Sequence, residues 1–338
     1  MGEDIGIDLG TTSILIYVKG KGIVLREPSV IAVDKRTNEV IAIGKEAQNM
    51  IGRVSDNIDV VKPLKDGVIS NFTLAGKMLK YYIKKACKKK PGQVLICVPS
   101  QITDVEKRAV IDVALDTGAK KVKLIDEPVA AAIGAGIDID KPSGNMVIDI
   151  GGGTTDIAVI SIGNSVVGKS INIAGNKFDS TIKNYLKKQF KILVGDRTAE
   201  EIKIKIGGVI PSLENNSMIV RGRNAENGLP MQIEITSRDL IVPLRNDAIK
   251  IVNAIMEVLE EAPPELVQDI SNKGIYLTGG GSLIYGLDKL ISECTSLNVM
   301  VADDAISCVA IGIGKSISNA NKEKNNIKKQ IQNNKKKQ

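Results

Sequence analysis

The 338-residue sequence contains no histidine and no tryptophan, and its four cysteines form no Cys-x-x-Cys pair. Without imidazole groups the chain offers no Ser-His-Asp or Cys-His nucleophile and no thiolate-imidazole metal site, so we expect no zinc centre. Any catalysis therefore has to depend on carboxylates, hydroxyls, lysines, backbone amides or a bound metal.

Aromatic side chains make up only 3% of the chain, which argues against a channel that stacks single-stranded nucleic acid. No run approaches the roughly 20 uncharged apolar residues of a membrane span, and no signal-peptide pattern opens the sequence. With 43% apolar and 25% charged residues, the composition is typical of a soluble globular chain with room for about two domains. We expect a cytoplasmic protein.

The net charge of +7 is concentrated at one end of the sequence. Residues 315–338 carry eight lysines and one glutamate, whereas residues 1–314 are neutral overall. From residue 319 onward the chain is rich in Lys, Asn and Gln and has almost nothing to bury. This composition predicts a disordered basic tail over residues 319–338.

One motif occurs twice. Asp-x-Gly-Thr-Thr at residues 8–12 and Asp-x-Gly-Gly-Gly-Thr-Thr at residues 149–155 each connect two apolar stretches, which predicts a strand, a turn and a second strand. A second pair of segments, residues 94–100 and 274–282, predicts a strand that ends at a loop of small residues. The repeated order predicts two related α/β halves.

Apolar residues at helical spacing predict amphipathic helices that cover these sheets. Thr103 and Glu106 form a capping box at the start of one helix, Gly118 lies at its end, and Pro263-Pro264 ends another. The side chains expected to pack in the core are Val105, Ala109, Val113, Ala114, Phe178, Ile182, Tyr185, Leu186, Phe190, Val252, Ile255, Met256 and Leu259.

An aspartate at the end of a buried strand, followed by glycines and threonines, suits a metal-bound phosphate. Glycine lets backbone N–H groups approach phosphate oxygens, hydroxyls add donors, and the carboxylate can hold Mg²⁺ directly or through water. The alternative is an ordinary hairpin whose aspartate caps the turn, but a copy on each half favours a phosphate clamp. The sequence has neither the P-loop motif nor Gly-x-Gly-x-x-Gly at the start of a helix.

Together with residues 126–136, 277–281 and 308–312, the two hairpins resemble the actin, chaperone and sugar-kinase ATPase superfamily. Residues 19–30, 63–69 and 197–200 are similar to the MreB family of bacterial actins. The resemblance extends from residue 4 to about residue 318. It implies an α/β, actin-like duplicated ATPase fold with two lobes, each a mixed sheet covered by helices, and a nucleotide in the cleft between them.

The resemblance also implies domain boundaries. The first lobe comprises residues 1–145 and 305–318, with a small subdomain at about 33–65. The second comprises residues 146–304, with a small subdomain at about 182–245.

The ligands implied by the resemblance are ATP or ADP with Mg²⁺. Asp8 and Asp149 match carboxylates that organise Mg²⁺, most simply through water. The residues that match the phosphate surroundings are Gly10, Thr11, Thr12, Gly151, Gly152, Gly153 and Thr154. Gly279, Gly280 and Gly281 match the loop beside the adenosine, and Glu200 and Lys203 match positions at the ribose and adenine edge.

Glu127 matches the carboxylate that positions the attacking water, and Thr154 and Asp156 could support the same water. This role is physically sensible because phosphoryl transfer needs an in-line water more than it needs a strong base. The alternative is that Glu127 caps the helix that starts at Pro128, where a carboxylate also favours the positive helix end.

The resemblance implies an ATPase that slowly hydrolyses ATP to control its own polymerisation and that acts in cell-shape determination. The expected partner is the chain itself, in filaments of antiparallel paired strands, with other cell-shape or motility proteins as further partners. The alternative function is a chaperone-type or sugar-kinase-type ATPase that acts on a separate substrate. We find no peptide-binding region after the ATPase segment and no cluster suited to a sugar pocket.

Proteins of this family commonly attach to the inner face of the membrane through an N-terminal amphipathic helix or a short apolar loop. The first predicted strand begins by Ile5, and residues 84–92 are basic, so neither device is expected here. The tail lysines Lys328, Lys329, Lys335, Lys336 and Lys337 provide an electrostatic substitute on an anionic membrane. A solvated tail is the alternative, and specific nucleic-acid binding is not expected because residues 1–314 carry no net charge.

Overall fold

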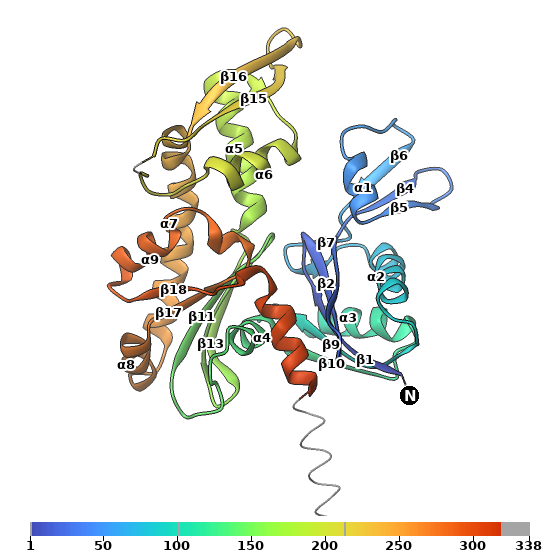
Figure 1. Ribbon diagram of the computed structural model, residues 1–338, viewed down its shortest axis with the longest axis vertical. Helices are drawn as coiled ribbons and strands as arrows, with labels where there is room; N and C mark the ends of the chain where they lie inside the picture. Colours follow the sequence, from blue (N-terminus) through green and yellow to red (C-terminus); the bar gives the residue numbers. More distant parts are fainter. Residues whose placement is uncertain (1, 101, 213, 319–338) are drawn as a thin grey trace, which may run out of the picture. The chain divides into compact units, whose positions relative to one another are not determined.

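The computed structural model describes residues 2–100, 102–212 and 214–318, and the chain divides into two compact units (Figure 1). Unit 1 comprises Met1–Asn49, Ile58–Asp138 and the chain from Ser307 onward. Unit 2 comprises Met50–Asn57 and Ile139–Ile306. The predicted basic tail lies outside the described residues.

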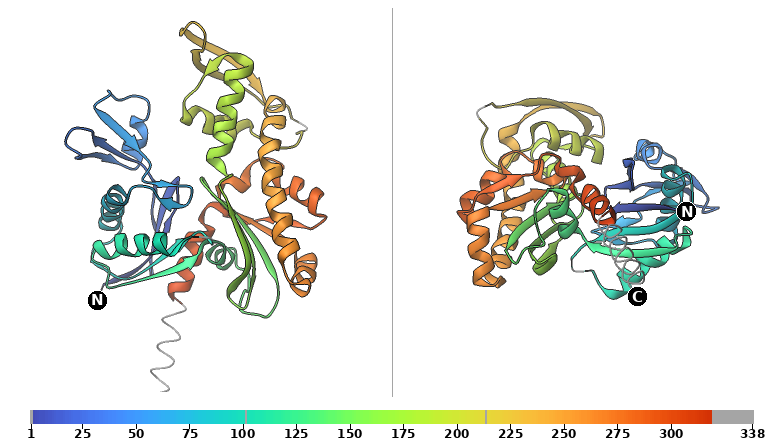
Figure 2. Two further views of the ribbon diagram at one scale, coloured as in Figure 1. Left: turned by 180° about the vertical axis from the view of Figure 1, so that it is seen from behind. Right: turned by 60° about the horizontal axis from the view of Figure 1, so that its bottom comes forward.

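A five-stranded mixed sheet in the order β10-β9-β1-β2-β3 forms the centre of unit 1. The first three strands of the chain form an antiparallel meander, whereas β9 runs parallel to β1 and β10 runs parallel to β9. Helices α2 and α3 pack beside each other in this unit (Figures 1 and 2). Their bounds and those of the strands are β1 (Glu3–Leu9), β2 (Ser13–Val18), β3 (Gly22–Pro28), β9 (Pro91–Val98), β10 (Lys121–Asp126), α2 (Phe72–Ala86) and α3 (Asp104–Asp116).

Smaller elements complete unit 1. A three-stranded sheet in the order β5-β4-β6 and a short hairpin of β7 and β8 follow the meander, and α4 follows β10. Residues 308–318 are also helical. The bounds are β4 (Ile31–Asp34), β5 (Val40–Ile43), α1 (Lys45–Met50), β6 (Ile58–Val61), β7 (Leu64–Lys65), β8 (Val68–Ile69) and α4 (Glu127–Gly134).

The central sheet of unit 2 has the same order and the same strand directions as that of unit 1. Its order is β13-β12-β11-β17-β18, in which β11, β12 and β13 form the antiparallel meander and β17 and β18 are the parallel strands. The prediction of two related α/β halves is therefore confirmed. The bounds are β11 (Asn145–Ile150), β12 (Thr155–Ser161), β13 (Asn164–Ile171), β17 (Ile275–Thr278) and β18 (Val299–Val301).

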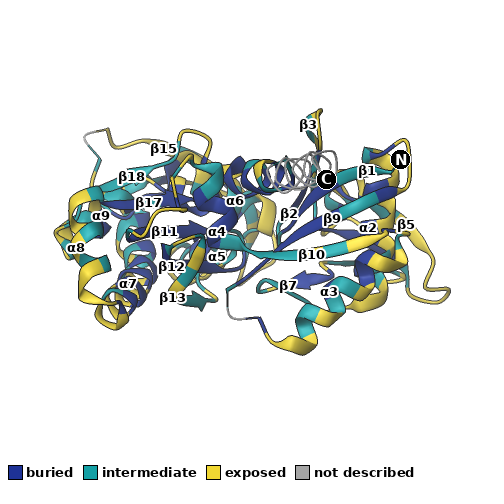
Figure 3. Cartoon of the chain, turned by 90° about the horizontal axis from the view of Figure 1, so that it is seen from below, coloured by how far each residue is buried: buried dark blue, intermediate teal, exposed yellow. Residues whose placement is uncertain are grey.

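Helices pack on the central sheet of unit 2, and a second small sheet packs on helices of the same unit. The small sheet has the order β14-β15-β16, and the long helix α7 packs against α5, β12 and β13. The central strand β11 is buried along its whole length (Figure 3). The bounds are α5 (Gly175–Phe190), β14 (Ile192–Leu193), α6 (Asp196–Ile206), β15 (Ser217–Asn224), β16 (Pro230–Thr236), α7 (Ser237–Glu261), α8 (Pro264–Lys273), α9 (Leu287–Thr295) and the 3₁₀ turns Gly280–Leu283 and Ala305–Ser307.

The predicted helix signals are present in the structure. Thr103 and Glu106 form both hydrogen bonds of the capping box of α3, and Gly118 follows the end of that helix with a φ of +92°. Pro263 separates α7 from α8, and Pro264 is the first residue of α8. Proline is tolerated there because its missing N–H would have no partner within the helix.

Two of the expected core positions are wrong. Val105 is 80% exposed because it lies in the first turn of α3, whereas the buried side chains of that helix begin at Val110. Met256 is 37% exposed, because it is rotated by about 100° around the axis of α7 from the buried Ile255. The buried stripe of α7 continues instead through Val258.

Helix α4 and the helix at residues 308–318 approach each other through glycine. A Cβ atom on Gly134 would lie 1.8 Å from the carbonyl oxygen of Cys308, and a Cβ atom on Gly312 would lie 1.8 Å from that of Ala130. Lys315 Nζ also donates to the carbonyl oxygens of Ile133 and Gly134, at 3.0 and 3.3 Å. The C-terminal part of the described chain is therefore packed backbone to backbone on α4.

Candidate functional site

The turn between β1 and β2 carries the first Asp-Gly-Thr motif. Asp8 lies near the end of β1 and is 9% exposed, and residues 10–12 form the turn itself. The backbone N–H of Gly67 donates to Thr11 Oγ1 at 3.0 Å, which connects this turn to the hairpin of β7 and β8. Within the part of the chain that the structure describes, Thr12 Oγ1 is buried and has no hydrogen-bond partner. A phosphate oxygen or a water molecule would satisfy such a hydroxyl.

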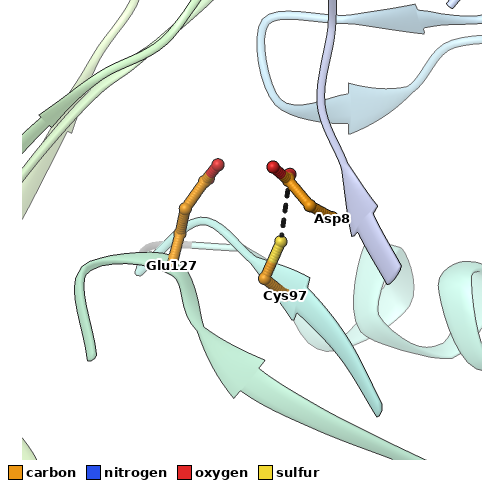
Figure 4. A group of neighbouring side chains, drawn as sticks. All are labelled: Asp8, Cys97 and Glu127. Carbon is orange, nitrogen blue, oxygen red and sulfur yellow. Dashed lines mark hydrogen bonds between the residues drawn. The ribbon is translucent and has the colours of Figure 1, made fainter. Parts of the chain in front are cut away.

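Three side chains of unit 1 converge beside this turn (Figure 4). Asp8, Cys97 and Glu127 each offer one ligand atom, and these atoms all lie within 4.8 Å of one another. Cys97, at the end of β9, donates from its thiol to Asp8 Oδ1 at 3.4 Å. Glu127 is the first residue of α4, and Asp126 is the N-cap of that helix. The carboxylate of Glu127 is thus directed at Asp8 and Cys97.

Burial shifts the pKa of two members of this cluster, Asp8 and Cys97. It raises the pKa of Asp8 to about 6, although the Cys97 hydrogen bond and the Arg26 charge act in the opposite direction. Burial also raises the pKa of the Cys97 thiol, and the negative charges of Asp8 and Glu127 raise it further. The thiol therefore stays protonated near neutral pH and is not a nucleophile. A cation beside Asp8 would favour its ionised form.

The second motif forms the turn between β11 and β12 in unit 2. Asp149 is 4% exposed and its Oδ1 accepts a hydrogen bond from Thr278 Oγ1 at 2.6 Å. Gly151 N–H donates to Thr154 O at 2.9 Å, which closes the turn. The carbonyl oxygens of Gly151 and Gly152 accept from the N–H groups that begin α5, at 3.1 and 2.8 Å. The turn is therefore fixed by the start of α5.

The two hairpins differ in the residue that faces the aspartate across the strand pair. Asp149 is paired with Asp156 across β11 and β12, whereas Asp8 is paired with Leu15 across β1 and β2. Asp156 is 1% exposed. Only the hairpin of unit 2 therefore carries a second carboxylate opposite its aspartate. Of the predicted water-positioning residues, Glu127 belongs to unit 1, and Thr154 and Asp156 belong to unit 2.

The glycine-rich loop after β17 packs on the end of β11. Gly279 has a φ of +79°, and a Cβ atom on it would lie 2.3 Å from the carbonyl oxygen of Ile150. A Cβ atom on Gly281 would lie 2.5 Å from Ile150 Cγ2, whereas Gly280 has more space. The loop at residues 279–281 therefore lies directly against Ile150 and Gly151 in unit 2, and side chains at Gly279 and Gly281 would disrupt this contact.

Lys203 lies beside the start of α5, where the N–H of Gly175 holds the carbonyl oxygen of Gly151. Its Nζ pairs with Asp179 Oδ1 at 2.9 Å and donates to Gly175 O at 3.2 Å, and both side chains of the ion pair are about 15% exposed or less. Glu200 lies one turn earlier on α6 and is half-buried. The structure thus brings the predicted Lys203 close to the predicted glycine turn.

Three contacts were not predicted from the sequence. They are the hydrogen bond of Thr278 to Asp149, the approach of Cys97 to Asp8, and the ion pair of Asp179 with Lys203. Thr278 is the last residue of β17, and Cys97 is the second-to-last residue of β9. Their positions near the ends of predicted strands were the signal that the sequence offered for these contacts. Each turn, taken by itself, combines donors with a buried carboxylate, which is the chemistry that suits a phosphate group with its metal. The five tail lysines assigned to a membrane lie outside the described residues.

Comparisons with known proteins agree on one family. The sequence model of the family described as MreB/Mbl protein matches residues 2–325. The cell shape-determining protein Mbl of Bacillus subtilis (strain 168) is 50% identical over 324 residues, which is 95% of this chain and 97% of that protein. The cell shape-determining protein MreB of Escherichia coli (strain K12) is 45% identical over 323 residues and 93% of each chain.

Solved structures give the same result. The crystal structure of MreB5 of Spiroplasma citri bound to ADP is 40% identical, with a TM-score of 0.90 over 94% of this chain and 99% of that chain. The structure of the same protein bound to AMPPNP is 39% identical, with a TM-score of 0.89 over 98% of this chain and 99% of that chain. The expected actin-like fold is therefore confirmed.

Proposed function

Because the chain belongs to the MreB/Mbl family, we propose that it is a filament-forming bacterial actin that binds and hydrolyses ATP and acts in cell-shape determination. The observation that carries this proposal is the pair of buried aspartates, each at a glycine and threonine turn, on two sheets of the same topology. Relatives solved with ADP and AMPPNP support an adenine nucleotide as the ligand. Hydrolysis would then control the lifetime of the polymer.

The residues of the two turns have distinct tasks in this proposal. The backbone N–H groups and hydroxyls at residues 10–12 and 151–154 bind phosphate oxygens, and Asp8 and Asp149 hold the metal, most simply through water. When bound, Mg²⁺ neutralises charge that develops on the transferred phosphoryl group. Lys203 and Glu200, with the loop at residues 279–281, form the contacts to the nucleoside.

Glu127 orients the attacking water in this scheme. It is the first residue of α4, and its carboxylate oxygens can accept a hydrogen bond from water. Thr154 and Asp156 are proposed to hold the same water from unit 2. Because the Cys97 thiol stays neutral, it adds no negative charge beside the carboxyl groups of Asp8 and Glu127.

Polymerisation provides the test of this function. The purified chain is expected to release heat on titration with Mg-ATP and then to pellet in an ultracentrifuge, and phosphate is expected to appear slowly during the same incubation. A sample with EDTA in place of Mg²⁺ is the control and should stay in the supernatant. Binding of Mg-ATP without any pelleting or self-association would favour an ATPase that acts on a separate substrate.

We extend the proposal to attachment at the inner face of the cell membrane. Among the described residues, the structure has no helix that is long and apolar enough to cross a membrane. The loop between α2 and β9 exposes Lys88, Lys89 and Lys90 instead of apolar side chains. Attraction of the five tail lysines to an anionic leaflet contributes on the order of 1 kcal/mol for each engaged lysine. A filament multiplies this weak contact, because its subunits bind the surface together.

Replacing the lysines at 328, 329, 335, 336 and 337 by glutamine is expected to lower binding of filaments to anionic vesicles at least about tenfold, because the electrostatic attraction is removed. Co-sedimentation with vesicles containing phosphatidylglycerol measures this effect, and vesicles of phosphatidylcholine alone are the control. Binding by the original chain should weaken as salt is raised. Equal binding by the glutamine variant would show that the tail lysines are not the attachment site.

A further inference from the structure

Ser29 follows β3 directly and is fully buried, with 0% of its surface exposed. Its hydroxyl donates to the carbonyl oxygen of Gly10 at 2.6 Å, and its backbone N–H donates to the carbonyl oxygen of Thr12 at 3.0 Å. Both acceptors belong to the turn between β1 and β2. One residue, distant from the turn in the sequence, thus holds two of its carbonyl groups.

These two bonds fix the direction of the N–H groups in the turn. In a trans peptide unit the C=O and the following N–H point to opposite sides of the chain. When Ser29 holds the carbonyl groups of Gly10 and Thr12, the N–H groups of Thr11 and Ser13 are directed away from Ser29. We infer that Ser29 is a positioning residue for ATP hydrolysis, which orients the phosphate-binding turn of unit 1. This inference rests on the proposed function.

The surroundings of Ser29 are rigid enough for this task. The preceding residue, Pro28, accepts a hydrogen bond at its carbonyl oxygen from the hydroxyl of the buried Tyr82 on α2, at 2.7 Å. The following residue, Val30, accepts one from the N–H of Gly44, at 2.8 Å. Hydrogen bonds on both sides therefore attach the backbone at Ser29 to other elements of unit 1. A binding site keeps a precise geometry when the residues that support it are themselves held in place, as Ser29 is here.

The turn has little freedom to compensate for a lost support. A Cβ atom on Gly10 would lie 2.8 Å from the carbonyl oxygen of Ser13, so the backbone of the turn is closely folded on itself. Thr11 Oγ1 is already occupied as the acceptor for Gly67. Without the Ser29 hydroxyl, the Gly10 carbonyl would rotate toward another donor, and the N–H of Thr11 would rotate with it.

Replacing Ser29 by alanine tests the inference, because it removes the hydroxyl and keeps the backbone N–H. We expect kcat for phosphate release to fall at least about tenfold, with KM for Mg-ATP changed less than about threefold. The reason is that misdirected N–H donors weaken stabilisation of the transition state more than they weaken binding of the substrate. The rate is counted per molecule that binds Mg-ADP in a titration, so that unfolded protein does not contribute.

Ser292→Ala is the matched control. Ser292 Oγ makes the same kind of bond, to the carbonyl oxygen of Leu297 at 2.7 Å, but on α9 of unit 2. We expect its kcat to stay within about twofold of the original chain. Ser29→Thr restores a hydroxyl and should recover most of kcat. If the added methyl group prevents folding, Ser29→Cys, with a weak donor of similar size, should give a kcat between those of Ser29→Ala and the original chain.

The outcomes separate two kinds of failure. If the original chain neither binds nor hydrolyses Mg-ATP, the proposed function fails. If the original chain hydrolyses ATP and Ser29→Ala does so at an equal rate per binding molecule, the role of Ser29 is refuted while the function stands. The role of Ser29 would also be refuted if Ser29→Thr and Ser29→Cys fold but have a kcat as low as that of Ser29→Ala. The loss would then come from altered packing and not from the missing hydroxyl.

Discussion

Replacing Glu127 by glutamine is expected to lower ATP hydrolysis at least about 100-fold and to leave the affinity for Mg-ATP within about threefold. Glutamine has nearly the same shape, but its neutral amide is a much weaker acceptor for the proton of an attacking water. The carboxylate is needed for the chemical step, so binding and assembly should persist while phosphate release is lost. Phosphate release and pelleting, measured on the same sample, check both parts.

Asp126→Asn is the matched control for this prediction. Asp126 is the neighbouring carboxyl group, burial raises its pKa, and its side chain makes no capping hydrogen bond to α4. Its loss should change hydrolysis less than about threefold. If the Glu127 variant hydrolyses ATP at the original rate, Glu127 does not orient the water. Its role would then be the alternative one, in which its negative charge stabilises the positive end of α4. An equal loss in both variants would mean that the start of α4, rather than the Glu127 carboxylate, had been disturbed.

Replacing Gly312 by alanine is expected to destabilise unit 1 by about 3 kcal/mol or more, near the upper end of overpacking costs. The added methyl group would lie 1.8 Å from the carbonyl oxygen of Ala130, so α4 and the helix at residues 308–318 would have to separate. A loss of this size corresponds to a decrease in melting temperature of about 6–12 °C. Thermal unfolding followed by circular dichroism measures it.

Gly76→Ala is the control for the glycine substitution. Gly76 lies inside α2, and a Cβ atom on it would have no atom within 4 Å among the described residues. Alanine at that position should stabilise the protein by up to about 1 kcal/mol, because it favours the helix. If Gly312→Ala melts at the same temperature as Gly76→Ala, the two helices are not in the close contact that the structure describes.

Local patterns in the sequence were sufficient for the hairpins and their turns. A run of apolar residues, an aspartate and a group of small residues specify a strand and a turn without any distant contact, and the copy at residue 149 showed that the arrangement was duplicated. The capping box at Thr103 was equally local. The family resemblance then supplied the lobes and the nucleotide ligands, which no single segment encodes.

The contacts that surround the site could not be derived in this way. Cys97 is separated from Asp8 by 89 positions, and Thr278 from Asp149 by 129, so only the parallel pairing of β9 with β1 and of β17 with β11 brings them together. No local signal reports such pairing. The errors at Val105 and Met256 have a related cause. Helical spacing indicates which face of a helix is buried, but it does not say where along or around the helix the burial ends.

The helix at residues 308–318 has a consequence for synthesis of the chain on the ribosome. Unit 2 can complete its central sheet as soon as β18 has emerged, because its strands lie within one uninterrupted segment. The first residues of unit 1 are synthesised before unit 2. However, α4 stays uncovered until the helix at residues 308–318, which follows unit 2 in the sequence, has been synthesised. The earlier half of the gene product therefore matures last, which reverses the usual N-terminal-first order of folding during translation.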